Sequence, residues 1–124
     1  CALPIFRVRV ERAAAPFSSR AQEGQVLRMP IKHGEGAYTA APDVLERLEA
    51  DGRVLLRYCD VDGQVSADAN PNGAAHNIAG IVNQAGNVFG LMPHPEHAVE
   101  SAIGGVDGMV LLGSMIDSAM DGVR

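Results

Sequence analysis

The segment Pro93-His94-Pro95-Glu96 carries the residue pair in this sequence best suited to acid–base chemistry. It directly follows an apolar segment, residues 88–92, that is predicted to be a strand. In an extended chain, side chains two residues apart project to the same side, so Glu96 can accept a hydrogen bond from one ring nitrogen of His94. The other ring nitrogen would then act as an oriented base, as in a nucleophile–base–orienter triad. The alternative is a solvated His and Glu in a surface loop.

A triad also needs a nucleophile, and the sequence offers two cysteines, Cys1 and Cys59. Cys59 ends an apolar run that is predicted to be a strand, so we expect a buried and unreactive thiol. Cys1 lacks the neighbouring glycines of a sharp nucleophile turn. An N-terminal cysteine can instead use its own α-amino group as the base, so an amidohydrolase built on Cys1 stays an alternative. Nothing in the sequence suggests secretion, so we expect reduced thiols in the cytoplasm.

The other polar candidates have weaker patterns. His33 and Glu35 lie between glycines, which is typical either of a polar turn or of a loop that meets a partner, and neither is predicted to be catalytic. His76 and His97 have no suitably spaced partners, and with His94 they match no standard zinc pattern, so no metal site is expected. Three asparagines are predicted to hold turns through side-chain-to-backbone hydrogen bonds; these are Asn70, Asn72 and Asn77.

Hydropathy patterning predicts a strand-rich α/β chain that positions these residues. Strands are expected over residues 1–10, 25–31, 53–59, 78–83 and 88–92, and the last two should form a hairpin around Ala85-Gly86. Helices are expected over 42–50 and 106–120. In the second helix, an apolar face should pack in the core and a polar face should be solvated. The apolar face is Val106, Met109, Val110 and Ile116, and the polar face is Asp107, Ser114, Ser118 and Asp121.

Composition excludes two classes of partner. The net charge of −5 and the pI of about 5.2 disfavour binding to nucleic acid. The apolar stretch from Met109 to Ile116 is too short to span a bilayer, so no membrane association is expected.

Taken in order, the motifs of the chain resemble the C-terminal half of a class I glutamine amidotransferase, of the type that forms the glutaminase of phosphoribosylformylglycinamidine synthase. The resemblance covers nearly all of residues 1–124 as one unit. It implies the later part of a flavodoxin-like α/β domain, with a parallel sheet, added antiparallel strands and a C-terminal helix. The matching segments are residues 32–38, 53–60, 70–73, 78–81, 86–88 and 90–96.

The resemblance also implies an activity and partners. Such enzymes hydrolyse glutamine to glutamate and ammonia. A synthetase subunit then uses the ammonia, with ATP and magnesium, to aminate formylglycinamide ribonucleotide in purine biosynthesis, and a small third subunit can take part. His94 matches the family's base and Glu96 matches its orienter. No cofactor is expected in this chain, because it has no phosphate-cradling loop of the form G-x-x-x-x-G-K-[ST].

The sequence departs from the family in one respect. The G-x-C-x-G turn that carries the family's nucleophile is absent, and so is the glycine-rich oxyanion loop. We therefore expect the chain to be inactive on glutamine by itself. A non-catalytic module that docks on the synthetase through residues 33–38 is the alternative from a different functional class. A half-domain would also expose sheet edges and apolar faces, which predicts self-association.

Overall fold

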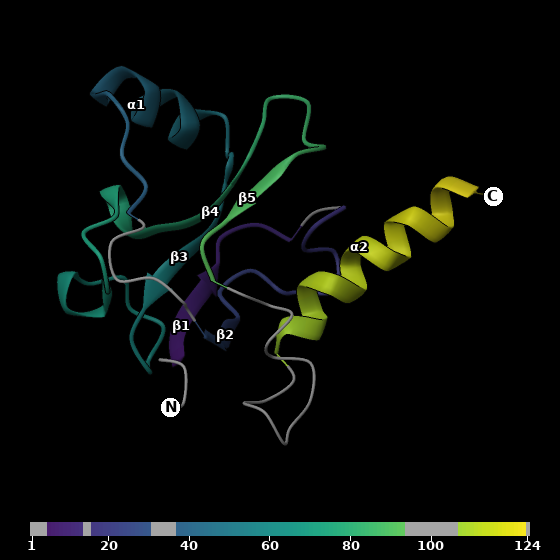
Figure 1. Cartoon of the computed structure of the whole chain (residues 1–124), viewed down its shortest axis with the longest axis horizontal. Coiled ribbons are helices and arrows are strands. Elements are labelled where there is room, and N and C mark those ends of the chain that lie inside the picture. The colour runs from purple at the N-terminus through teal and green to yellow at the C-terminus, as the bar shows by residue number, and fades with distance from the viewer. Residues whose placement is uncertain (1–4, 14–15, 31–36, 94–106, 124) are drawn as a thin grey trace.

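The computed structural model describes residues 5–13, 16–30, 37–93 and 107–123, and in them the chain forms one five-stranded sheet with two helices (Figure 1). The predicted strand-rich α/β fold with a C-terminal helix is confirmed. Cys1, His33, Glu35, His97 and the pair His94 and Glu96 lie outside the described residues. The strands are β1 (Ile5–Val10), β2 (Val26–Pro30), β3 (Val54–Cys59), β4 (Ile78–Val82) and β5 (Phe89–Leu91).

The order of the strands across the sheet is β2-β1-β3-β4-β5, and every pairing is antiparallel. The parallel strands that the resemblance implies are therefore not among the described strands. Strands β2 and β5 are the two edges of this sheet. Self-association through these edges stays a prediction.

The core follows from alternating side chains in β1. Val8 lies opposite Leu27 of β2 and Tyr58 of β3, and all three side chains are buried. The intervening Arg9 points to the other face, where its guanidinium binds the carboxylate of Glu11 at 2.8 Å. The alternation of side chains that predicts this strand therefore places its apolar side chains in the core and its charged side chains on the other face of the sheet.

Strand β3 is buried on both faces, except at Arg57, which explains its nearly continuous apolar sequence. Leu56 and Tyr58 belong to the main core. Val54 belongs to a second apolar cluster with Leu48 and Ile78, under helix α1 (Pro42–Ala50). The predicted bounds of this helix are confirmed: Pro42 occupies its first turn, and Gly52, with a φ of 64°, follows its end.

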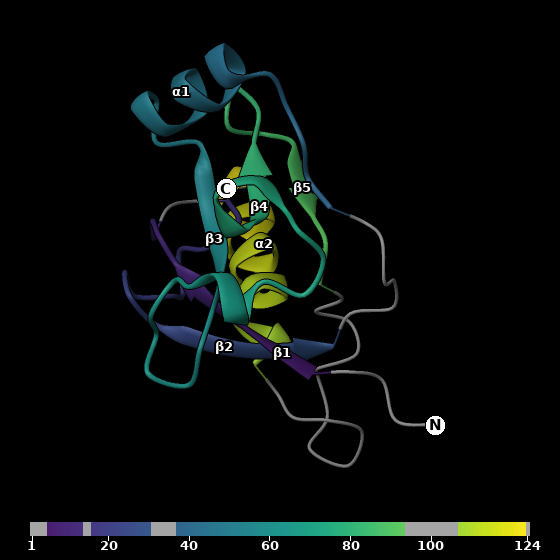
Figure 2. The ribbon, with the colours of Figure 1, turned by 90° about the vertical axis from the view of Figure 1, so that its left-hand side faces the viewer.

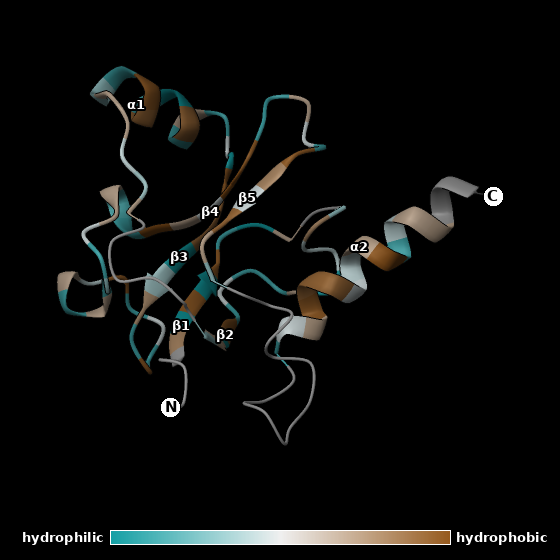
Figure 3. Cartoon of the chain, viewed as in Figure 1, coloured by the Kyte–Doolittle hydropathy of each residue, from teal (hydrophilic) through white to brown (hydrophobic). Residues whose placement is uncertain are grey.

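Helix α2 (Gly108–Val123) buries a face that only partly matches the one that the sequence predicts, since Val110 packs against the main core as expected. Leu111 and Ser114 are fully buried, whereas Met109 and Ile116, assigned to the buried face, are 38% and 56% exposed. The colouring in Figure 3 shows that apolar residues cover much of this helix, so hydropathy marks no single face clearly. In Figure 2 the helix runs behind β3 and β4. Within the described residues, no helix is long and apolar enough to cross a membrane.

The burial of Ser114 is explained by its hydrogen bonds. Its hydroxyl accepts from the backbone N–H of Arg20 at 2.9 Å and donates to the carbonyl of Val110 at 2.6 Å, so the Ser114 hydroxyl is satisfied both as donor and as acceptor. The Arg20 guanidinium forms a two-point ion pair with Asp117, at 2.7 and 2.8 Å. A Cβ at Gly113 would collide with the Arg20 side chain. Polar and small residues, rather than the apolar stripe, therefore hold α2 to the segment after β1.

Replacing Gly80 in β4 with Ala is expected to lower the free energy of unfolding by about 1–3 kcal/mol, the usual cost of overpacking. The new Cβ would lie 2.9 Å from the Phe89 ring, and that ring packs on Phe17 with 4.9 Å between ring centroids. Gly90→Ala in β5 is the matched control, because its Cβ meets only Ile81, at 3.8 Å. Urea denaturation of both variants is the measurement. Equal losses would contradict the packing argument.

Candidate functional site

The β4–β5 hairpin determines where the segment that carries His94 leaves the sheet. The backbone N–H of Met92 donates to the carbonyl of Ala79 at 3.0 Å, so pairing continues one residue beyond β5. Pro93, the last described residue before the predicted pair, is buried. In the sequence, His94 therefore follows directly on a buried residue. Their own geometry lies outside the described residues, so their roles as base and orienter stay predictions.

The turn of this hairpin is held by its own side chains, as the predicted Ala85-Gly86 signal requires. The Asn83 carbonyl oxygen accepts from the backbone N–H groups of Asn87 and Val88, both at 2.9 Å. Gly86 has a φ of 77°, which a residue with a side chain rarely adopts. These interactions fix the conformation of the hairpin turn that precedes Pro93.

An apolar pocket of about 390 Å³ lies at the end of the hairpin from which Pro93 leaves. Tyr38 is one of its lining residues, and the carbonyl of Tyr38 accepts from the N–H of Ala75 at 2.9 Å. The pocket has no titratable side chain except Tyr38, so it can accommodate an apolar group but cannot ion-pair with a charged one. Its lining is Tyr38, Ile78, Ala79, Gly80, Ile81, Gly90, Leu91 and Met92.

The predicted turn-holding role of the asparagines is confirmed. The Asn70 carbonyl oxygen accepts from the backbone N–H groups of Asn72, Gly73 and Ala74 at 2.8–3.2 Å. The Asn77 amide donates to the carbonyls of Tyr58, at 3.2 Å, and Ser66, at 2.6 Å. These bonds tie the loop before β4, with its short 3₁₀ turns at Ala67–Ala69 and Ala75–Asn77, to β3. The asparagines therefore support the loop that precedes the hairpin.

His76 has a partner that the sequence does not reveal. Its Nδ1 lies 3.0 Å from a carboxylate oxygen of Glu49, which also binds the Arg57 guanidinium. A hydrogen bond from Arg57, supported by His76, holds the pKa of the Glu49 carboxyl below its ordinary value. His76 also has a positive φ of 53°. No signal in the sequence links residues 49, 57 and 76, which belong to α1, β3 and a 3₁₀ turn.

Neither a nucleophile nor a metal site is found in the part of the chain that the structure describes. Cys59 is 4% exposed, and burial raises the pKa of its thiol to about 11, which keeps it protonated and unreactive. The predicted inertness of Cys59 is thus supported. No group of three or more His, Cys, Asp or Glu side chains lies close enough to hold a metal ion within these residues.

The sequence of this chain is similar to those of known proteins. The model of the CobB/CobQ-like glutamine amidotransferase domain matches residues 5–104. A Salinibacter ruber protein named phosphoribosylformylglycinamidine synthase subunit PurQ is 56% identical over 110 residues, which cover 89% of this chain and 47% of that protein. A Symbiobacterium thermophilum protein of the same name is 54% identical, with the same shares of the two chains covered.

The fold has a counterpart among solved structures. A chain in the structure of PurLQS from Thermotoga maritima matches with a TM-score of 0.74 and 38% identity, over 94% of this chain and 47% of that one. The chain therefore spans about half the length of the relatives that it matches.

Proposed function

This chain belongs to the CobB/CobQ-like glutamine amidotransferase family, and we propose that it forms the C-terminal half of the glutaminase component of phosphoribosylformylglycinamidine synthase. The observation that carries the proposal is the 56% identity to a subunit of that name, spread over 89% of the chain. The hairpin that leads into the His94 segment supports it.

In the proposed reaction, His94 is the general base and Glu96 fixes its orientation. A thiolate attacks the side-chain amide carbon of glutamine, and the tetrahedral intermediate collapses to a thioester as ammonia leaves with a proton from His94. Water, deprotonated by His94, then attacks the thioester and releases glutamate and the thiol. The buried Cys59 cannot supply this thiolate. We propose that the other half of the amidotransferase domain contributes it, together with the oxyanion donors.

The ammonia would be used by a synthetase partner in the cytoplasm, with ATP and magnesium bound on that partner. A chain of this fold occurs in the structure of PurLQS from Thermotoga maritima, which supports this part of the proposal. We propose an equivalent assembly for this chain, with a synthetase and a small third subunit.

A non-catalytic module that docks on the synthetase is the second candidate function. The observation in its favour is that the only described cysteine is buried and protonated. Both proposals share a fold and a partner, and they differ in whether His94 takes part in the chemistry.

Ammonia release from glutamine by the purified chain tests whether the chain has a nucleophile of its own, which both candidate functions exclude. We expect no release above that of the Cys1→Ser variant, because the one cysteine among the described residues, Cys59, is buried, and Cys1 lacks the glycines of a nucleophile turn. Release that disappears in Cys1→Ser would contradict this expectation and would favour the amidohydrolase built on Cys1. Release that survives Cys1→Ser but is lost in Cys59→Ser would contradict the assignment of Cys59 as unreactive.

A further inference from the structure

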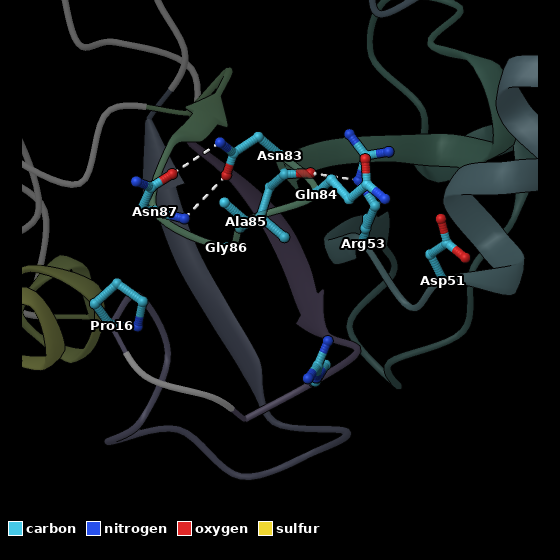
Figure 4. A pocket seen from close by; sticks show the side chains of 10 residues that line it. Pro16, Asp51, Arg53, Asn83, Gln84, Ala85, Gly86 and Asn87 are labelled. Carbon is cyan, nitrogen blue, oxygen red and sulfur yellow. Dashed lines mark hydrogen bonds between the residues drawn. The ribbon is translucent and has the colours of Figure 1, made fainter.

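A second and larger hollow, of about 640 Å³, lies at the turn of the β4–β5 hairpin (Figure 4). It is bounded by the hairpin turn, the segment after β1 and the end of α1. It shares no residue with the apolar pocket beside Met92. Its lining is largely polar and consists of Arg12, Pro16, Asp51, Arg53, Val82, Asn83, Gln84, Ala85, Gly86 and Asn87.

Two arginines line this hollow, and each is anchored by one hydrogen bond to the backbone. The Nε of Arg53 donates to the carbonyl of Val82 at 2.9 Å. A terminal nitrogen of Arg12 donates to the carbonyl of Gly52 at 3.2 Å. A guanidinium carries five N–H donors, so each side chain is oriented by one bond and keeps other donors for a ligand. Neither arginine forms an ion pair with another described residue.

The hairpin turn adds neutral donors in a fixed arrangement. The Asn83 side chain is engaged within the turn, since its amide nitrogen also donates to the side-chain carbonyl oxygen of Asn87 at 2.8 Å. The Asn87 amide nitrogen has no hydrogen-bond partner within the described part of the chain. In Figure 4 the Gln84 side chain lies beside Arg53. The turn is thus held by its own hydrogen bonds, and the carboxamide groups of Gln84 and Asn87 both line the hollow.

The charge balance of the hollow favours an anion. The lining contains two guanidinium groups and one carboxylate, that of Asp51, whereas the whole chain carries a net charge of −5. A positive site on an acidic protein concentrates small anions locally. Planar guanidinium groups match the geometry of carboxylate and phosphate oxygens. The volume lies within the range of roughly 300–1,000 Å³ that is usual for small-molecule sites.

We propose that this hollow binds a small oxyanion, a phosphate or carboxylate group, between the guanidinium groups of Arg12 and Arg53. The site involves neither His94 nor glutamine, so it stands or fails separately from the proposed function. Asp51 would then oppose the ligand and limit its affinity.

The test is titration of the ¹⁵N-labelled full chain with inorganic phosphate, and separately with acetate, at constant ionic strength set by sodium chloride. We expect saturable shifts confined to the backbone amides of residues 83–87 and to the Arg53 Nε–H. Saturation by phosphate alone would assign a phosphate group to the site, and saturation by acetate would assign a carboxylate. The absence of saturable shifts with both anions would overturn the proposal.

Variants make the test specific. Arg53→Gln and Arg12→Gln are each expected to weaken binding by about tenfold or more, because each removes charge-assisted hydrogen bonds. Arg47→Gln is the matched control, since Arg47 is exposed on α1 and pairs with Asp43 outside the hollow. Asp51→Asn is expected to tighten binding, and Asp43→Asn is expected not to. Should Arg53→Gln fail to fold, the exposed Arg12 and Asp51 variants decide the question. Equal weakening in Arg47→Gln, or weaker binding in Asp51→Asn, would overturn the proposal.

Discussion

Replacing His94 with Ala in an active glutaminase that carries this chain is expected to lower kcat for glutamine hydrolysis by at least about 10³-fold, the scale seen when a triad base is lost. The loss should be large because His94 is proposed to act twice. It protonates the leaving ammonia and then deprotonates the water that attacks the thioester. Glutamine binding does not use the imidazole in this scheme, so KM should change little.

The experiment needs a complete domain. A chimera in which this chain replaces the matching half of the Salinibacter ruber subunit supplies one, because the two sequences are 56% identical over 110 residues. Ammonia release from glutamine is measured in the presence of the synthetase partner. Glu96→Gln is the second variant: it keeps the shape of the side chain but removes the charge that stabilises the imidazolium. It should lower kcat strongly as well.

His97→Ala is the matched control, since this histidine lies three residues further along and has no predicted partner. It should leave kcat unchanged. If His94→Ala retained the activity of the parent chimera, the proposed base would be wrong, and the docking module without catalytic chemistry would become the better account. If His97→Ala were as damaging as His94→Ala, the loss would reflect disturbed structure and not a catalytic role.

The elements that sequence reasoning predicts correctly are those whose signals are local. Helix α1 has the predicted bounds because Pro42 and Gly52 act on the backbone of their own neighbours. The β4–β5 hairpin follows from two apolar runs and a glycine turn. The burial of Cys59 follows from the apolar run that precedes it.

The features that sequence reasoning misses depend on contacts between distant segments. Arg12 and Arg53 are 41 positions apart, and only the pairing of strands brings both to the same hollow. His76 meets Glu49 across 27 positions. Neither pair has a spacing that a helix or strand would place on one face. The roles of His94 and Glu96 are carried by the resemblance and by the path of the hairpin, since both residues lie outside the described part of the chain.

Helix α2 shows a different kind of error, because there a correct helical pattern leads to the wrong orientation. Apolar residues cover much of the helix surface, so they do not define one buried face. The sequence-based assignment therefore depends on the polar residues, which it places on the solvated face. Ser114 is instead fully buried, because Arg20 and Val110 satisfy its hydroxyl. A buried serine with two hydrogen bonds costs little, and hydropathy alone cannot distinguish it from a solvated one.

Leu111→Ala is accordingly expected to lower the free energy of unfolding by about 2–5 kcal/mol, the range for a fully buried leucine. Leu111 is 0% exposed and belongs to the main core. Ile116 lies on the face that the sequence pattern assigns to the core, but its side chain is 56% exposed. Ile116→Ala should therefore change the free energy of unfolding by no more than about 0.5 kcal/mol. Urea denaturation of the full chain, followed by circular dichroism, measures both. The two orientations of α2 predict opposite rankings, so a larger loss in Ile116→Ala than in Leu111→Ala would show that the helix packs through its apolar stripe.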